Sequence, residues 1–562
     1  MKKRIMLLGL LALITSAAFG CSASKTSEDE TEVFPESLSW VRENVSISLN
    51  GDFGENIYSV SKDDSILPYN ENYRTVMDEL MEELNSEAYA MDEPLIIYNP
   101  YGTNNLSVNV YFTTAVDSKV SYVVSVDDSD IPDYSQTLYN EGEDNYTTEH
   151  SYQIIGLVPG YDNEISLTAT TVEGVSTIYT YSVDMSAVEC ESDTILDNVA
   201  GESDAELTEG LFVLFGLDKA FNANNYVYDN NGVLRADLVI NDYRSDRIVF
   251  IDGKLYYNTD VDEFAVIDRL GRIEKLYSID GYIMHHDYVY DETNNKFLIL
   301  VNSEEEEDTT IEDLIISLDL DTGEVEEVVD MKDLLPEIYD TAEMPESGEN
   351  TYGGTGLDWI HLNSLSIVNG EGDIVLSGRE ISTVIYVENV YENPAVKYMI
   401  ADEAVYADTI YSDLVLEKVG DFVNQAGQHT ITYAADESLE EGQYYLLMYN
   451  NNYGASNTRD DFPWDAYEGV GTFAEGDASK YYKYLVDENA GTYELVESFD
   501  VAYSSIVSSV QDVANNHVTS SGKSNCYAEY DENGELILQF NYTSQKYAYR
   551  AFKYDFCGVW FE

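Results

Sequence analysis

From about residue 209 to the end, the chain alternates short apolar runs with polar turns, and one unit repeats. The unit is an apolar stretch, a turn that contains Asp and Gly, and a second apolar stretch. Clear copies occur at residues 266–273, 318–325 and 485–493. Short strands repeated over roughly 350 residues, at about 50–60 residues per repeat, predict a six-bladed β-propeller. A parallel β-helix is the alternative, but the unequal spacing of the units argues against it.

Between residues 94 and 185 a similar alternation predicts a small N-terminal β-sandwich. Its strands are expected at residues 106–112, 120–124, 151–155, 165–169 and 177–181. Residues 186–208 are acidic and are expected to link this domain to the propeller, which spans residues 209–562. The predicted fold is therefore all-β, a six-bladed β-propeller preceded by a small N-terminal β-sandwich.

A short helix is predicted ahead of the sandwich, because apolar residues recur at helical spacing within residues 71–87. These residues are Val76, Leu80, Met81 and Leu84. Since residues 22–36 are polar and acidic, we expect residues 21–93 to form an acidic tether followed by this short helical segment.

The N-terminus has the pattern of an export signal. Lys2, Lys3 and Arg4 precede an apolar run, which ends in small residues before Cys21. This pattern predicts a bacterial lipoprotein signal peptide over residues 1–20, with lipidation at Cys21. An ordinary signal peptide with an incidental Cys is the alternative. Two acyl chains would anchor the protein stably, so we expect an extracytoplasmic lipoprotein anchored in the cell membrane.

Acidic residues dominate the charge, with 107 Asp and Glu against 28 Lys and Arg and a net charge of −79. Such a charge repels nucleic acid, which we exclude as a partner. An anionic substrate would need a locally positive pocket. The sequence leaves a homodimer open. Three further cysteines, Cys190, Cys526 and Cys557, could form disulfides after export, and Cys526 and Cys557 lie close enough in sequence to be candidates for a pair.

Three of the six histidines recur at matching points of the repeat. His286, His361 and His429 each precede a short strand, a polar turn and a strongly apolar strand. The innermost strands of a propeller line a central channel, so matching positions on successive blades converge there. Arg379 follows the hairpin that begins after His361, which predicts that both lie at the same end of one sheet.

A guanidinium and several imidazoles at a channel suit a tetrahedral oxyanion. Arg379 offers planar, bidentate donors to sulfate or phosphate oxygens, and an imidazole nitrogen can act as a nucleophile. A divalent metal site is one rival, with ligands from His285, His286 and Asp287, although Arg379 would repel a cation. A non-catalytic surface propeller that binds sugars or partners is another.

The motifs Asp358-Trp359-x-His361-x-Asn363-Ser364 and Ser377-x-Arg379 occur with His285-His286-Asp287 upstream and Gln428-His429-Thr430 downstream. Together they resemble the bacterial arylsulfate sulfotransferase family, over roughly residues 95–562. The resemblance implies transfer of a sulfuryl group from a phenolic sulfate ester to a phenol, without a phosphosulfate nucleotide.

The same resemblance implies a ping-pong mechanism through a sulfohistidine at His429. It implies that His286, His361 and Arg379 hold the sulfuryl oxygens, that one His aids proton transfer, and that Asn363 adds a substrate-binding donor. The partners are then small phenolic sulfates and phenols, and neither a cofactor nor a metal is expected. We expect the other histidines to be bystanders: His150, His285 and His517.

Overall fold

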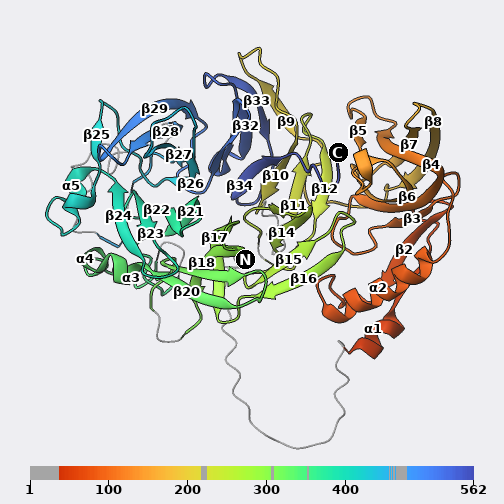
Figure 1. Cartoon of the computed structure of the whole chain (residues 1–562), viewed down its shortest axis with the longest axis horizontal. Helices are drawn as coiled ribbons and strands as arrows, with labels where there is room; N and C mark the ends of the chain where they lie inside the picture. Colours follow the sequence, from red (N-terminus) through yellow and green to blue (C-terminus); the bar gives the residue numbers. More distant parts are fainter. Residues whose placement is uncertain are drawn as a thin grey trace, which may run out of the picture.

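The computed structural model describes residues 37–216, 224–242, 244–305, 309–350, 354–454, 456, 458–459, 463 and 478–562. The predicted signal peptide, Cys21 and residues 22–36 lie outside this part of the chain. The described residues form six β-sheets arranged in a ring and an N-terminal domain at one side of the ring (Figure 1). The predicted all-β class and the six-bladed propeller are confirmed.

The N-terminal domain is built around one long strand, β4 (Ser107–Val126). Its first part pairs with two strands and its second part with two others, so the sheet folds over on itself. The other strands are β1 (Val45–Leu49), β2 (Ile57–Lys62), β3 (Leu95–Tyr98), β5 (Tyr134–Thr137), β6 (Thr147–Ile155), β7 (Asp162–Thr171) and β8 (Ser176–Asp184). Since β1 and β2 pair in this sheet, part of the segment expected to be a tether belongs to the folded domain.

Two helices, α1 (Leu38–Asn44) and α2 (Glu71–Asn85), pack on the N-terminal domain. Helix α2 confirms the helix predicted from spacing. Asn70 caps it, because its side chain accepts from the amides of Asn72 and Tyr73. Val76 and Met81 lie in a core with Leu95 from β3.

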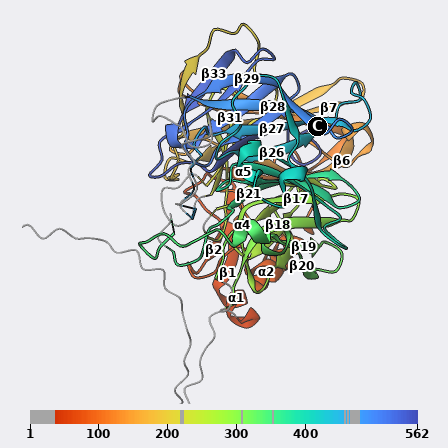
Figure 2. The same ribbon diagram turned by 90° about the vertical axis from the view of Figure 1, so that its left-hand side faces the viewer.

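Each propeller blade is a sheet of four antiparallel strands, and a fifth strand extends two of the blades at the outer edge, in parallel with its neighbour in the case of β25 (Glu417–Val419). From the inner to the outer strand, the first blade consists of β34 (Arg550–Tyr554), β10 (Leu211–Phe215), β11 (Asn225–Tyr228) and β12 (Leu234–Leu238). The next three blades, in the same order, are β13 (Val249–Ile251), β14 (Lys254–Asn258), β15 (Glu263–Ile267) and β16 (Ile273–Ser278); β17 (Tyr282–Asp291), β18 (Lys296–Ser303), β19 (Leu314–Asp319) and β20 (Val325–Asp330); and β21 (Leu362–Asn369), β22 (Asp373–Gly378), β23 (Thr383–Glu388) and β24 (Ala395–Ile400). The last two blades have five strands each: β26 (His429–Ala434), β27 (Gln443–Asn450), β28 (Ser479–Asp487), β29 (Thr492–Val501) and β25 (Glu417–Val419); and β30 (Ser509–Val513), β31 (Asn516–Ser521), β32 (Cys526–Tyr530), β33 (Leu536–Asn541) and β9 (Asp197–Ala200). Short helices α3 (Met331–Leu334), α4 (Pro336–Tyr339) and α5 (Glu403–Tyr406) lie between strands. In the side view, the sheet of β26–β29 lies above that of β17–β20 (Figure 2).

The repeated sequence unit is the hairpin between the third and fourth strands of a blade. In the turn between β15 and β16, Asp268 accepts from the amides of Leu270 (2.8 Å) and Arg272 (3.0 Å). Asp319 and Asp487 accept from turn amides in the same way. An Asp that bonds the backbone two residues on stabilises a tight turn, which explains why this residue recurs.

The ring is closed by both ends of the propeller sequence. The C-terminal strand β34 is the inner strand of the blade that begins with β10. Strand β9 pairs with β33 and is the outer strand of the last blade, so the segment expected to be a linker, residues 186–208, contributes to the propeller. Beyond β34, Trp560 donates from Nε1 to Gln153 of the N-terminal domain (3.0 Å).

The cysteines do not form the pair considered from the sequence. Cys526 is buried in β32 and Cys557 is exposed near the C-terminus, and both are free thiols. Among the helices that the structure describes, none is long and apolar enough to cross a membrane.

Candidate active site

In three successive blades, a residue in or next to the inner strand has its backbone in the left-handed region. His286 (φ 60°), His361 (φ 53°) and Thr430 (φ 56°) lie in or directly before the inner strands β17, β21 and β26. Side chains without glycine's freedom are strained there, and such strain gathers at functional sites. His286 and His361 therefore occupy matching positions, whereas His429 lies one residue before the matching Thr430.

The hairpin of β21 and β22 brings His361 and Arg379 to the same end of their sheet. Leu362 pairs with Gly378, and the amide of Arg379 donates to the carbonyl of His361 (3.1 Å). The guanidinium is 4% exposed and forms an ion pair with Glu380.

His429 is held in one tautomer by its neighbours. Its Nδ1 lies 2.7 Å from Oδ1 of Asn451 and 3.1 Å from the carbonyl of Gly427, while Nε2 accepts from the amide of Val507 (3.1 Å). Nδ1 must therefore carry the proton, and Nε2 carries the lone pair. Burial, followed by the charge of Arg379, holds the pKa of His429 well below its usual value. The ring is thus neutral at physiological pH and is a competent nucleophile.

His286 is also neutral, but it has the opposite tautomer. Arg244 donates from Nη2 to its Nδ1 (3.0 Å), so Nε2 carries the proton and faces Glu312 at 3.3 Å. Burial holds the pKa of His286 well below its usual value. Its ring stacks on Tyr549 with centroids 5.3 Å apart, and it lies 4.9 Å from the ring of His361.

His361 lies between two buried carboxylates. Its Nδ1 is 2.9 Å from Oδ2 of Asp358 and also contacts Glu312. Burial tends to raise the pKa of Glu312, but the interactions with His361 and then with His286 outweigh it and hold that pKa well below the usual value. Burial raises the pKa of Asp358 to about 6. Glu312 is therefore ionised at neutral pH.

The structure places Asn363 behind His429. Its Nδ2 donates to the carbonyl of Gln428 (2.8 Å), the residue before His429, and its Oδ1 accepts from Ser364. Its own carbonyl accepts from Arg550 (2.9 Å). The amide therefore braces the strand that carries His429.

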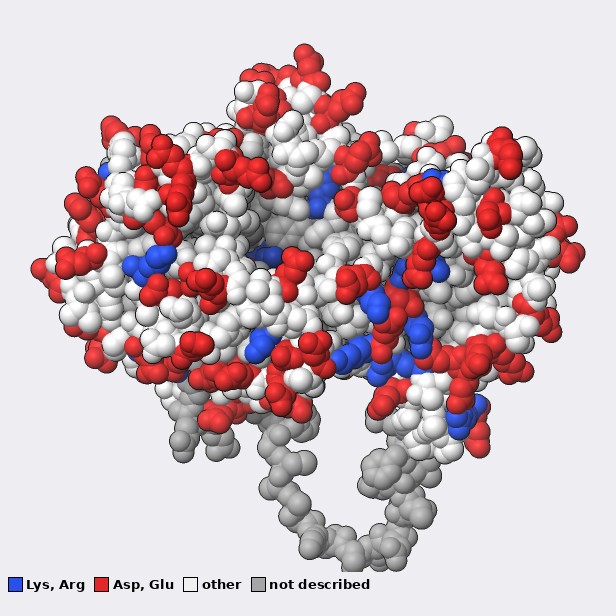
Figure 3. All heavy atoms as spheres, viewed as in Figure 1, with Lys and Arg blue, Asp and Glu red and all other residues white. Residues whose placement is uncertain are grey.

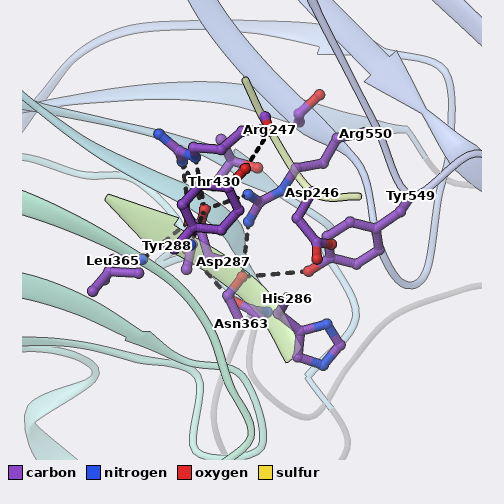
Figure 4. Close-up of polar contacts among 12 residues, drawn as sticks. Asp246, Arg247, His286, Asp287, Tyr288, Asn363, Leu365, Thr430, Tyr549 and Arg550 are labelled. Atoms are coloured by element: carbon purple, nitrogen blue, oxygen red, sulfur yellow. Dashed lines mark hydrogen bonds and ion pairs between the residues drawn. The ribbon is translucent and has the colours of Figure 1, made fainter. Parts of the chain in front are cut away.

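Asp287 belongs to a separate buried network, in which it pairs with Arg550 (2.7 Å) and Arg247 (2.8 Å). Figure 4 shows Asp287 facing these arginines, while the ring of His286 projects away from them. Asp287 also accepts from the amide of Leu365 in the next inner strand (3.3 Å). It therefore joins neighbouring blades and is not placed to bind a metal ion beside His286.

Among the described residues, two overlapping groups have the geometry to hold a metal ion. The ligand atoms of His285, His286 and Glu312 lie within 4.8 Å of one another, as do those of Glu312, Asp358 and His361. The guanidinium of Arg244 contacts His286 directly, and its positive charge opposes a cation at this point.

Sequence reasoning missed Arg244 and Glu312. Arg244 precedes the inner strand β13, and only 28 basic residues occur in the chain, so two arginines at 244 and 247 were a usable signal. Glu312 follows an acidic run at residues 304–308, which hid it. The bystanders His150 and His517 lie elsewhere, against Phe112 and Asp512 respectively.

Charge is unevenly distributed on the face of the molecule seen in Figure 3. Blue Lys and Arg atoms lie inside the hollow near the centre of this face, whereas the rim carries mainly red acidic groups. Within the site itself basic and acidic side chains lie together, since Arg379 pairs with Glu380 and Arg244 with Asp246.

Comparison with known families decides the class of this protein. The family described as Arylsulfotransferase (ASST) matches residues 196–553, and the Arylsulfotransferase Ig-like domain matches residues 95–186. The chain belongs to the arylsulfotransferase family. It is therefore a sulfotransferase, and small phenolic compounds fit the substrates of this family. The match to the Ig-like domain accords with the predicted N-terminal β-sandwich.

Solved structures add only distant similarity. A hypothetical selenium-binding protein from Sulfolobus tokodaii is 11% identical, with a TM-score of 0.34, covering 78% of this chain and 97% of that one. An auxiliary nutrient binding protein from Bacteroides thetaiotaomicron is 8% identical, with a TM-score of 0.31, covering 81% and 92%. These scores are too low to support any argument. A search of curated proteins gives no match.

Proposed function

We propose that this arylsulfotransferase works by a ping-pong mechanism through a sulfohistidine at His429. The observation that carries the proposal is the fixed tautomer of that ring, with Nδ1 bonded to Asn451 and the Nε2 lone pair beside Val507. A buried, neutral imidazole near Arg379 can attack a sulfur atom whose oxygens face a guanidinium.

In the first half-reaction, Nε2 of His429 attacks the sulfur of an aryl sulfate. The N–S bond forms, the S–O bond to the phenol breaks, and the phenol leaves with a proton from the site. Arg379 neutralises the sulfuryl oxygens. Asn451 keeps its bond to Nδ1–H throughout, so the ring stays oriented while Nε2 changes partner from the Val507 amide to sulfur.

In the second half-reaction, the oxygen of another phenol attacks the same sulfur. The S–O bond forms, the N–S bond breaks, and the phenol proton passes to a base in the site. Ordinary phenols have a pKa of about 10, so this step needs general-base help. His361 is held by carboxylates on Nδ1 and is our candidate for that base.

Steady-state kinetics test this proposal. We expect release of phenol from an aryl sulfate to depend on a second phenol, and double-reciprocal plots at several acceptor concentrations to be parallel. Intersecting lines would show that both phenols bind together and would rule out the ping-pong order.

The location is also a proposal. We propose that Cys21 is lipidated and anchors the enzyme outside the cytoplasm. The basic start, the apolar run and the small residues before Cys21 support this.

A further inference from the structure

Glu312 contacts two imidazoles of the site at once, those of His286 and His361. Its backbone is fixed in the left-handed region (φ 61°), where its amide donates to Asn302 (2.6 Å) and its carbonyl accepts from the amide of Leu362 (2.8 Å). A buried carboxylate on strained backbone is costly. The negative charge of Glu312 also repels a sulfate ester, so a role in packing alone does not explain why Glu312 lies here.

The contacts around Glu312 indicate which nitrogen of each ring carries the proton. Arg244 can only donate, so His286 accepts at Nδ1 and carries its proton on Nε2, which lies 3.3 Å from Glu312. An ionised carboxylate only accepts, so His361 carries its proton on Nδ1, which bonds Asp358 at 2.9 Å and contacts Glu312. Nε2 of His361 lies on the opposite edge of the ring from these carboxylates.

We propose that Glu312, together with Asp358, is a positioning residue that makes His361 the acid and base for the phenol oxygen. The inference rests on the proposed function and identifies the residues behind its proton step. In the donor half-reaction, Nε2–H of the His361 imidazolium gives its proton to the phenol oxygen as the S–O bond breaks and the N–S bond forms on His429. In the acceptor half-reaction, neutral Nε2 takes the proton back as the new S–O bond forms.

The arrangement of Glu312 and His361 is similar to the Asp–His pair of a serine protease. A carboxylate on Nδ1–H fixes the tautomer and stabilises the imidazolium that forms when Nε2 is protonated. Glu312 also contacts His286, so the same carboxylate lies against both rings, whose centroids are 4.9 Å apart.

The test is the variant Glu312→Gln in the mature full-length enzyme, with donors that differ in their leaving phenol. Para-nitrophenolate leaves without a proton, so its release in the first turnover should stay close to the wild-type rate. Release of unsubstituted phenol, with a pKa of about 10, should slow on the order of 10²-fold. The rate should therefore fall more steeply with leaving-group basicity in the variant.

Asp313→Asn is the matched control. Asp313 is the next residue and is also buried, but its carboxylate accepts from Nε1 of Trp359 (2.8 Å) and does not contact an imidazole in the described structure. It should keep the wild-type dependence on the leaving group. If Glu312→Gln does not fold, as judged by circular dichroism, Asp358→Asn should show the same change in slope.

Other results overturn the inference. An equal loss with every donor means that Glu312 supports the fold only. Faster turnover means that it occupies the place of a sulfuryl oxygen. Stoichiometric zinc in the wild type that is lost in Glu312→Gln means that the cluster binds a cation. If the wild type itself forms no sulfated intermediate, the proposed sulfohistidine mechanism is wrong. This result differs from every outcome that would contradict only the role of Glu312.

Discussion

At the scale of single residues, the chemistry of the site follows from which nitrogen of each imidazole carries the proton. Asn451 decides this for His429, because its Nδ2 donates to the carbonyls of Ser504 (2.8 Å) and Val507 (3.0 Å), which turns Oδ1 toward Nδ1 of His429. The amide orientation is therefore fixed by three bonds. A residue outside the reacting atoms thus selects the nucleophilic nitrogen.

The low pKa of His429 predicts an unusual pH dependence. The nucleophile is the neutral ring, and its folded-state pKa is depressed, so it stays neutral as pH falls through the ordinary histidine value of about 6.5. With para-nitrophenyl sulfate, which needs no acid, we expect the first-turnover rate to be flat from about pH 8 to about pH 6. Stopped-flow absorbance measures this, and a half-maximal rate near pH 6.5 would contradict the assignment.

Arg379→Lys keeps the charge but removes the planar pair of donors. Arg379 is 4% exposed and adjoins the His361 backbone, so a lysine has little room to recover both contacts. We expect kcat to fall on the order of 10²-fold, as when an oxyanion donor is removed. Near-normal turnover in a folded variant would make Arg379 a structural residue.

Sequence predicted the site only as far as its rare residue types allowed. Three of the six histidines could be selected because they recur at similar points of the repeat, and Arg379 could be selected because it lies in a short motif. Glu312 was one acidic residue among 107, and only the fold shows that its carboxylate meets two imidazoles. Its role could not be inferred from composition or spacing.

At the scale of elements, the propeller depends on strands that pair across most of the chain. Strand β34 pairs with β10, and a buried ion pair fixes it to β32, where Lys553 meets Glu529 at 2.8 Å with both side chains 0% exposed. Glu529 also accepts from the amide of Thr208 (2.6 Å). The last strand is thus held to the segment that precedes the first one.

Lys553→Met tests this closure. Removal of one partner leaves the charge of Glu529 buried and unpaired, which should lower the free energy of unfolding by about 3–5 kcal/mol. Urea denaturation followed by circular dichroism measures the change. The control is Lys480→Met, whose partner Asp500 is 67% exposed, and it should cost less than about 1 kcal/mol. Equal effects would mean that the closing pair adds no stability.

The difference between local contacts and contacts across a long stretch of chain explains which elements the sequence predicted. Turns such as that at Asp268 are local, since the carboxylate and the amides it accepts lie within four residues. Strand β9 pairs with β33 across more than 330 residues, and its short polar stretch gives no periodic signal. It was therefore expected to be a linker.

At the scale of the whole molecule, the proposal that the enzyme is anchored outside the cytoplasm rests on the basic and apolar residues before Cys21. We expect Cys21→Ser to leave the membrane fraction or to remain unprocessed, because two acyl chains give stable anchoring and none remains. Detergent extraction and immunoblotting measure this. If the variant fractionates and migrates like its parent, the lipoprotein proposal is wrong.

The most direct test of the account is the intact mass of the enzyme after rapid quench with an aryl sulfate and no acceptor. We predict one equivalent of phenol released in a burst and a gain of one SO3 group, mapped to the peptide that contains His429. His429→Ala should lose both, and His361→Ala should slow the burst without moving the adduct. A protein that turns over donor with acceptor, yet never carries the added mass, would contradict the sulfohistidine mechanism.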